Sequence, residues 1–227
     1  MFVRPALVAY LLCIGAPSLF GQSYGSYDLV PLVSRTGGGP DTDPSAKLKL
    51  LDQVLDDLAR HAIDYPVHFE EGGAKDRAAK DVVKLSAWLD TLIDVPNPPV
   101  YFMKRAAMVG SIGHNLDIPG MAQKADAIFQ KWLSMRPDDP AGNQMYGAFL
   151  GGVGKAKEAI PFLEKALALG VPQAPYSLGI AYLHVGDKEK ATKNLKAYLD
   201  KNPDDKKTRD LYDAIASGRV RIRTVTK

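Results

Sequence analysis

Hydrophobic residues recur at helical spacing from residue 44 onward. Asp43 and Pro44 suit the start of a helix, since an aspartate can cap it and a proline is tolerated in its first turn. The apolar positions are Leu48, Leu51, Leu55, Leu58 and Ala62, and, after the Gly72-Gly73 break, Ala78, Val82, Leu85, Leu89 and Leu92. Spacing of three and four residues marks one face of an α-helix. Residues 44–97 are therefore predicted to form a pair of helices, and no stretch before the C-terminus alternates convincingly like a strand.

Three repeats of a helix pair are predicted beyond this region, at 106–139, 140–171 and 172–205. The matching positions are Gly113, Gly120, Ala125, Phe129, Trp132 and Pro137; then Gly147, Gly154, Ala159, Leu163, Ala166 and Val171; then Gly179, Gly186, Ala191, Leu195, Tyr198 and Pro203. Small residues are expected where the two helices of each repeat cross, and the pairs are Gly113/Ala125, Gly147/Ala159 and Gly179/Ala191. The middle glycine of each copy is expected to end the first helix, because glycine adopts a left-handed conformation at little cost.

The third repeat resembles the tetratricopeptide repeat (TPR) family. Leu178 and Gly179 are followed three residues later by Tyr182, and the match continues through Ala191 and Leu195. The resemblance covers residues 106–205, roughly half of the chain, and the first two copies follow the family pattern less closely. It implies an all-α fold, a right-handed solenoid of helix pairs with a concave groove. Residues 44–97 would be an N-terminal helical extension, and 98–217 would hold the repeats and a C-terminal capping helix.

Residues 1–21 are predicted to be a secretory signal peptide. Arg4 precedes an apolar run from Ala6 to Ala16 that is too short to span a bilayer, and cleavage is expected after Gly21. A buried strand, an uncleaved anchor and lipidation at Cys13 are the alternatives. Cleavage would leave a chain without cysteine, which suits an oxidising compartment. The protein is therefore expected to be exported, either to the periplasm or out of the cell.

Two further segments are expected to be loosely held. Residues 22–43 contain Gly37-Gly38-Gly39-Pro40 and several Ser, Thr and Asp residues, which is typical of a linker or flexible arm. Residues 218–227 alternate charged and apolar side chains, which suits a frayed terminus or a strand added to a partner.

Composition and charge exclude several classes of function. With 46% hydrophobic and 24% charged residues, the chain is too apolar for a disordered protein. Its 29 Lys and Arg residues nearly balance 26 Asp and Glu residues, so the net charge of +3 makes no strong case for nucleic acid or an anionic membrane. The lysines at 188, 190, 193 and 196 are expected on a solvated outer face. One cysteine cannot form an internal disulfide.

No catalytic or cofactor-binding pattern is complete. Residues 21–25 spell the G-x-S-x-G of a hydrolase without its strand and helix, and residues 151–156 lack the full set of a phosphate-binding loop. His61 and His68 lack metal-ligand spacing, and His114 and His184 are expected to be solvated or partly packed. The chain is therefore predicted not to be an enzyme and to hold no metal or cofactor. A cell-envelope enzyme, or an accessory subunit of one, is the alternative.

The TPR resemblance places a set of residues on the concave groove, which suits binding of a protein or peptide. They are His114, Gln144, Met145, Gln173, Tyr176, Ile180, Leu183 and His184. The set is mostly apolar and amide with few charges, so an apolar or amide-rich segment is a better candidate partner than an acidic tail. Self-association through the repeats is a further possibility.

Overall fold

The computed structural model describes residues 23–33 and 44–219, which form helices and the segments that connect them. No strand occurs within these two ranges, and the prediction of an all-α fold is confirmed. The expected signal peptide at 1–21 and residues 220–227 of the expected tail lie outside the described residues. The chain divides into two compact units, one ending at Met135 and the other beginning at Arg136.

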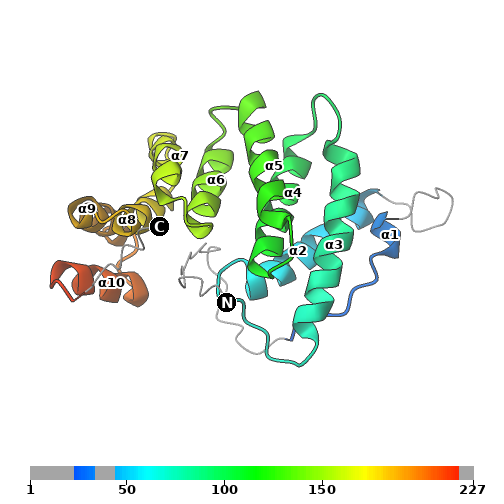
Figure 1. Ribbon diagram of the computed structural model, residues 1–227, viewed down its shortest axis with the longest axis horizontal. Coiled ribbons are helices and arrows are strands. Elements are labelled where there is room, and N and C mark those ends of the chain that lie inside the picture. The colour runs from blue at the N-terminus through cyan, green and yellow to red at the C-terminus, as the bar shows by residue number, and fades with distance from the viewer. Residues whose placement is uncertain (1–22, 34–43, 220–227) are drawn as a thin grey trace. The chain divides into compact units, whose positions relative to one another are not determined.

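The described residues of the first unit form five helices, whose arrangement is seen in Figure 1. They are α1 (Val30–Val33), α2 (Pro44–Ala62), α3 (Ala74–Ile93), α4 (Val100–Asn115) and α5 (Met121–Met135). The stripes expected from the sequence face the core, since Leu51, Leu55 and Leu58 of α2 are buried, as are Val82 and Leu85 of α3. α3 and α5 both pack against α4, and α2 packs against α4 and α1. The two helices within 44–97 therefore pack on other helices of the unit and do not form a closely paired hairpin.

Residues 23–33 pack onto α2 and α3, and we call them the N-terminal strap. Tyr24, Leu29 and Leu32 are each at most 2% exposed, and α1 contacts both α2 and α3. This part of the chain differs from the loosely held arm expected over 22–43, because its tyrosines and leucines supply buried side chains amid Ser and Gly residues. Residues 34–43, with their glycines, lie outside the described residues.

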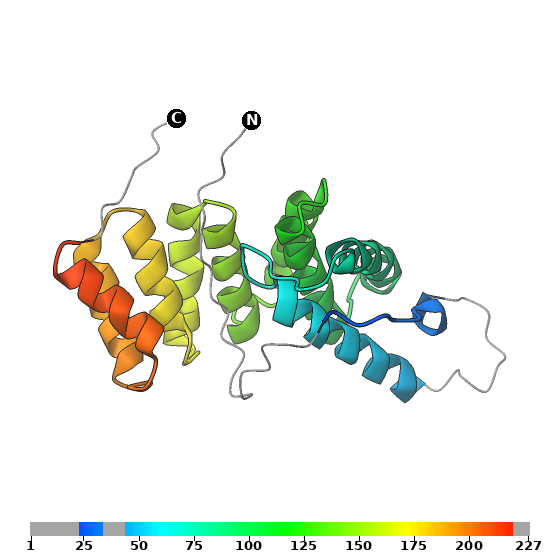
Figure 2. The ribbon, with the colours of Figure 1, turned by 90° about the horizontal axis from the view of Figure 1, so that it is seen from below.

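The second unit is a run of antiparallel helices in which each packs against the next (Figure 2). They are α6 (Pro140–Gly152), α7 (Ala156–Ala168), α8 (Ala174–His184), α9 (Lys188–Leu199) and α10 (Lys206–Ala216). Gly154 and Gly186 have φ angles of 83° and 88°, in the left-handed region expected of glycines in these turns. Asp187 caps α9, since its carboxylate accepts a hydrogen bond from the Lys190 backbone N–H at 2.9 Å.

Glycines allow the helices to approach closely within the pairs α6/α7 and α8/α9. A Cβ atom on Gly147 would lie 2.5 Å from Leu163 Cγ, and one on Gly179 would lie 2.6 Å from Leu195 Cγ. Both sites also face the backbone oxygen of the expected alanine, at 3.2 Å from Ala159 and 3.3 Å from Ala191. Any larger residue at Gly147 or Gly179 would therefore force the pair apart.

The first repeat crosses in a different register from the one expected. A Cβ atom on Gly113 would meet Met121, at 2.7 Å from its Cγ, whereas a Cβ atom on Gly110 would lie 2.9 Å from Ala125 Cβ. The pairing Gly113/Ala125 is therefore wrong, and Ala125 instead packs on Gly110, one helical turn earlier. α4 begins at Val100, ahead of the expected repeat start at 106, and both Gly110 and Gly113 of this helix lie against α5.

α10 closes the outer end of the second unit by packing on α9. Thr208 and Ile215 are buried, whereas Leu211 is only partly buried. Lys188, Lys190 and their neighbours Lys193 and Lys196 are exposed on α9, as the sequence predicts. In α10, Ile215 is the buried apolar side chain and Thr208 the buried polar one.

Candidate functional site

Each of the two repeated first helices of the second unit, α6 and α8, presents one stripe of residues that is not packed into the core. On α6 the stripe is Ala141, Met145, Ala148 and Gly152; on α8 it is Gln173, Ser177, Ile180 and His184, with Leu183 beside it. The spacings of four, three and four residues place each set on one side of its helix. His184 is exposed and the others are partly exposed. We call these residues together the α6/α8 face.

The structure places the expected groove residues in three settings, which are the α6/α8 face, the buried part of the second unit, and the first unit. Met145, Gln173, Ile180, Leu183 and His184 lie on the α6/α8 face.

Gln144 and Tyr176 are instead buried, at 8% and 7% exposure. The Tyr176 ring lies against the Tyr198 ring with centroids 5.3 Å apart, so it holds α8 to α9. His114 belongs to the first unit, where it is partly exposed near the end of α4. The structure thus brings five of the eight residues together on one face.

Sequence reasoning missed the small residues of the face. Ala141, Ala148 and Gly152 are partly exposed on α6, and Ser177 is partly exposed on α8. Small side chains give no hydrophobic signal, although the shift of 32 positions from Met145 to Ser177 and from Ala148 to Ile180 would have found them. Gly151, next to this stripe, has no atom within 4 Å of the place where a Cβ would stand. Space for an added side chain is therefore present beside the α6 stripe.

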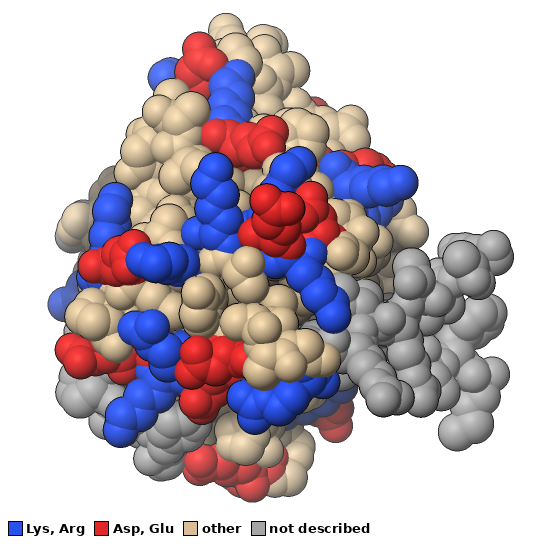
Figure 3. Space-filling view, turned by 90° about the vertical axis from the view of Figure 1, so that its left-hand side faces the viewer, with Lys and Arg blue, Asp and Glu red and all other residues tan. Residues whose placement is uncertain are grey.

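The α6/α8 face differs from the rest of the second unit in charge. Neither α6 nor α8 contains Asp, Glu, Lys or Arg, whereas α7, α9 and α10 each contain several. At the end of the unit that carries α9 and α10, basic and acidic side chains alternate over the surface (Figure 3). The α6/α8 face therefore presents no Asp, Glu, Lys or Arg side chain of its own.

Two polar side chains near the face have pKa values set by their surroundings. The Tyr182 hydroxyl donates to Glu164 Oε1 at 2.6 Å, and this hydrogen bond raises the pKa of Tyr182 to about 12. The contact ties α8 to α7. The partial loss of solvent around the His184 ring lowers its pKa, so His184 is a neutral ring at neutral pH.

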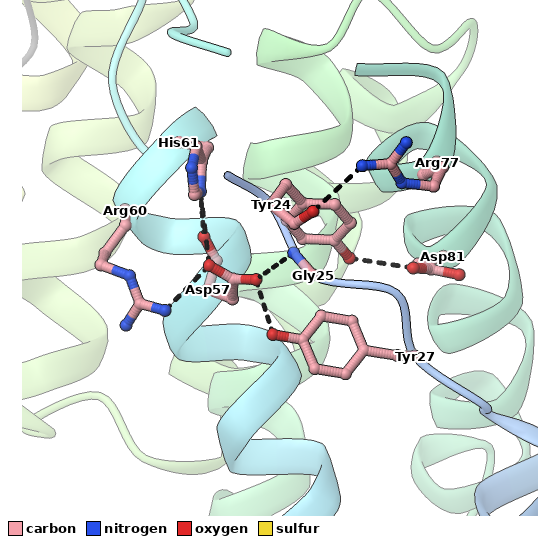
Figure 4. A network of polar contacts seen from close by, with 8 residues as sticks. All are labelled: Tyr24, Gly25, Tyr27, Asp57, Arg60, His61, Arg77 and Asp81. Atoms are coloured by element: carbon pink, nitrogen blue, oxygen red, sulfur yellow. Dashed lines mark hydrogen bonds and ion pairs between the residues drawn. The ribbon is translucent and has the colours of Figure 1, made fainter. Parts of the chain in front are cut away.

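The first unit contains a buried polar network between the strap and the two helices beside it (Figure 4). Asp57 of α2 accepts hydrogen bonds from Tyr27 Oη at 2.6 Å, from the Gly25 backbone N–H at 2.9 Å and from Arg60 at 2.8 Å. Asp81 of α3 accepts one from Tyr24 Oη at 2.9 Å. Both carboxylates point at the strap, and the strap supplies most of their hydrogen-bond donors.

The two carboxylates of this network are perturbed in opposite directions. Burial acts to raise the pKa of Asp57, but the hydrogen bonds from Tyr27 and Gly25 together with Arg60 outweigh it, so the pKa is lowered. At Asp81 burial dominates over the hydrogen bond from Tyr24, and the pKa is raised. Asp57 is therefore held as an anion by its donors, whereas Asp81 is paired by one hydroxyl and is destabilised as an anion.

The other residues that the sequence analysis considered for metal binding or catalysis lie in the first unit and near the α6–α7 turn. The His61 ring stacks on Phe69 with centroids 5.3 Å apart, and its Nδ1 lies 2.8 Å from the Asp57 backbone oxygen. Among the described residues, no group of three or more His, Cys, Asp or Glu side chains is placed to hold a metal ion. Residues 151–156 comprise the end of α6, the turn at 153–155 and the first residue of α7, and of residues 21–25 only 23–25 are described, within the strap.

Solved structures of other proteins are similar to this chain, although no protein-family model and no curated protein matches it. One is TTC0263, a thermophilic TPR protein of Thermus thermophilus, with a TM-score of 0.53, 17% identity, and coverage of 76% of this chain and 90% of the other. The chain has the TPR fold. The MamA RS-1 ArsTM double mutant matches this TPR-like chain at a TM-score of 0.51 with 21% identity, over 75% of this chain and 84% of the other.

The TPR-like helices are too short or too polar to cross a bilayer. Within the described ranges, no helix combines the length and apolar character that a membrane span needs.

Proposed function

We propose that this chain is an exported, non-catalytic scaffold that binds a protein or peptide segment on the α6/α8 face. The observation that carries the proposal is the uncharged, partly exposed stripe on both α6 and α8, next to helices rich in charge. A folded protein gains nothing for its own stability by leaving Ile180, Leu183 and Met145 in contact with water. Helix-pair repeats hold such residues on a rigid surface, which suits recognition of a partner.

A bulky side chain at Ala148 is expected to block this face. The Ala148 side chain is partly exposed in the middle of α6, so Ala148→Trp would cover the stripe without entering the core. Lys193→Trp on the exposed side of α9 is the matched control. A photo-cross-linking residue at Met145 in the exporting cell would capture the partner, whose affinity for both variants is then measured by calorimetry. We expect affinity to fall about tenfold or more, or about 1.4 kcal/mol, with Ala148→Trp only.

Equal loss of affinity in Ala148→Trp and Lys193→Trp would contradict this placement of the partner. A second photo-cross-linking residue at Lys193 gives the background labelling, because that side chain points away from the core of the α8/α9 pair. Capture of the same proteins at Met145 and Lys193 would also argue against a specific face.

Export is the second part of the proposal, and it is supported by the charged and apolar pattern of residues 1–21. The only cysteine, Cys13, lies in that segment, so its removal leaves a chain free of thiols. We expect N-terminal sequencing of the protein recovered from its producing cells to begin at Gln22. A sequence that begins at Met1 would overturn the export proposal and leave the binding proposal standing.

A further inference from the structure

The turn between α7 and α8 carries two leucines that the fold leaves in contact with water. Leu167 is 41% exposed and Leu169 is 38% exposed, more than any other large apolar side chain in the described part of the second unit. Beyond Gly170, Val171 is partly exposed and Pro172 is exposed. We call Leu167, Leu169, Val171 and Pro172 the α7–α8 corner.

Exposure at the place of Leu167 is particular to the middle repeat. The alignment of the three repeats matches Leu167 with Leu133 and Leu199. These two leucines are 9% and 2% exposed, against 41% for Leu167. The fold can therefore bury a leucine at this place, and in the middle repeat it does not.

The corner also lacks the acidic residues of the two corresponding turns. The aligned pairs are Asp138 and Asp139 in the first repeat, Pro172 and Gln173 in the middle repeat, and Asp204 and Asp205 in the third. Asp139 and Asp205 cap the helices that follow them, whereas Gln173 makes no side-chain cap hydrogen bond to α8. Residues 166–186 contain no Asp, Glu, Lys or Arg, so the corner and the α8 part of the α6/α8 face form one uncharged stretch.

The backbone of the turn is held without the two leucine side chains. The Gly170 N–H donates to the Leu167 carbonyl oxygen and the Val171 N–H to the Ala166 carbonyl oxygen, both at 3.0 Å, and Gly170 has a φ angle of 81°. This is the Schellman motif, in which an apolar contact commonly joins the positions of Val171 and Ala166. The side chains of Leu167 and Leu169 are therefore available to another molecule, and the fixed turn lowers the entropy that binding costs.

A second copy of the chain and a membrane are poor occupants of the corner. Each subunit of a stable dimer buries about 800 Å², and two partly exposed leucines present far less. A membrane surface would need positive charge or a larger apolar area. The charged residue that precedes the corner is Lys165, and its Nζ already lies 2.8 Å from Asp138 Oδ1.

The partner on the α6/α8 face is the occupant that the chain geometry favours. Gln173, at the start of the α8 stripe, directly follows Pro172 of the corner. The Cα atoms of Leu169 and Gln173 are at most about 14 Å apart, since each residue spans no more than about 3.6 Å. Four or five extended residues bridge that distance, so one partner chain can contact both surfaces.

We infer that the α7–α8 corner binds one large aliphatic side chain, such as leucine, of the partner segment that lies on the α6/α8 face. This inference rests on the proposed function and deepens it. The partner segment is uncharged along the face and carries, where it passes the start of α8, an aliphatic residue that packs on Leu167 and Leu169. Ion pairs take no part in this contact, so its strength should not depend on salt.

Titration with N-acetyl-leucinamide tests the corner directly, and N-acetyl-serinamide is the matched polar probe. Binding to the purified protein is followed by the shifts of the backbone ¹H–¹⁵N resonances. We expect N-acetyl-leucinamide to shift the resonances of residues 166–173 and N-acetyl-serinamide to leave them unchanged. Val83 of α3, which is 48% exposed, reports unspecific contact. Equal shifts around Val83 and in residues 166–173 would overturn the inference, as would the absence of a shift in residues 166–173.

Leu169→Ser, with Val83→Ser as its control, connects the corner with the partner. Both substitutions replace an exposed apolar side chain, so neither should change the melting temperature by more than about 2 °C. The protein captured through Met145 should bind Leu169→Ser about fivefold more weakly than the wild type, because an aliphatic contact is lost, and should bind Val83→Ser equally well.

Comparison with Ala148→Trp separates this inference from the proposed function. Weaker binding to Ala148→Trp, with unchanged binding to Leu169→Ser, would overturn the corner and leave the proposed function standing. Weaker binding to Leu169→Ser alone would show that the partner does not lie on the α6/α8 face, and both proposals would be wrong. Unchanged binding to both variants would also contradict both.

Two further measurements test the other occupants. Sedimentation velocity reports association of two copies, and cosedimentation with vesicles of phosphatidylethanolamine and phosphatidylglycerol reports membrane binding. We expect Leu169→Ser to change neither result. A dimer that this substitution abolishes would assign the corner to a second copy, and vesicle binding that it abolishes would assign the corner to a membrane. Either result would overturn the inference.

Discussion

Gly179→Ala is expected to destabilise the second unit by about 2 kcal/mol. Alanine is normally preferred to glycine inside a helix by about 1 kcal/mol, but the added Cβ would lie 2.6 Å from Leu195 Cγ and 3.3 Å from the Ala191 backbone oxygen. Leu195 is fully buried and cannot move aside. Helices α8 and α9 must separate, and overpacking of this kind typically costs about 1–3 kcal/mol. Chemical denaturation followed by circular dichroism measures the change.

Gly151→Ala is the matched control for this prediction. Gly151 also lies in a helix, near the end of α6, but nothing stands within 4 Å of its added Cβ. Stability should stay unchanged or rise by about 0.5 kcal/mol. Gly147→Ala, with Leu163 in the place of Leu195, should behave like Gly179→Ala. If all three variants were equally stable, the glycines would not set the approach of the helices.

Asp57→Asn is expected to lower stability by about 2 kcal/mol, whereas Asp81→Asn should leave it nearly unchanged. Asp57 is 2% exposed and accepts hydrogen bonds from Tyr27, Gly25 and Arg60, which favour its charged form. An amide group keeps its shape but loses the charge that strengthens these bonds. Among the described residues, Asp81 accepts a hydrogen bond from Tyr24, and asparagine can accept that bond without the burial of a charge. Thermal and chemical unfolding of both variants measure the difference.

The same two residues give opposite dependences on pH. The lowered pKa of Asp57 contributes stability above the ordinary value of 3.8, and this stability is lost as the pH falls through the folded-state pKa. The raised pKa of Asp81 favours its protonated form, so its contribution is present below 3.8 and is lost as the pH rises through its folded-state pKa. In Asp81→Asn, the loss of stability that Asp81 causes as the pH rises above 3.8 should therefore disappear. In Asp57→Asn, the loss of stability that Asp57 causes as the pH falls below 3.8 should disappear. If both variants kept the pH dependence of stability that the wild-type protein shows, these assignments would be contradicted.

The sequence predicted the repeated helices well because their determinants are local. The turn glycines Gly154 and Gly186 and the cap Asp187 lie within a few residues of the backbone they shape. The close approach of Gly179 to the second helix of its pair follows from repeat spacing alone. The first repeat departs from the expected register because α4 offers two glycines, Gly110 and Gly113, and spacing does not say which one meets Ala125.

The strap escaped prediction because its partners are distant in sequence. Tyr24 binds Asp81 and Arg77, which are 57 and 53 residues away. Segments with Ser, Gly and Asp residues are typical of linkers, whereas this one docks through its buried Tyr24, Leu29 and Leu32 and through hydrogen bonds to the carboxylates of α2 and α3. The candidate site was predicted only in part. The repeat pattern predicts which side of each helix is exposed. Whether Gln144 and Tyr176 are exposed or buried depends on neighbouring side chains that the pattern does not describe.

The strap also sets the order in which the parts of the chain can reach their final form. The hydrogen bond from the Tyr24 hydroxyl of the strap to Asp81 can form only after α3 has been synthesised. Tyr182 and Glu164, which also share a hydrogen bond, are only 18 residues apart. Contacts between distant positions slow folding because a long loop must close first. The helix pairs of the second unit can therefore form as soon as each is complete, and we expect the strap to dock more slowly. Until the strap docks, Tyr24, Leu29 and Leu32 are exposed, and such exposed apolar side chains are the kind that chaperones bind.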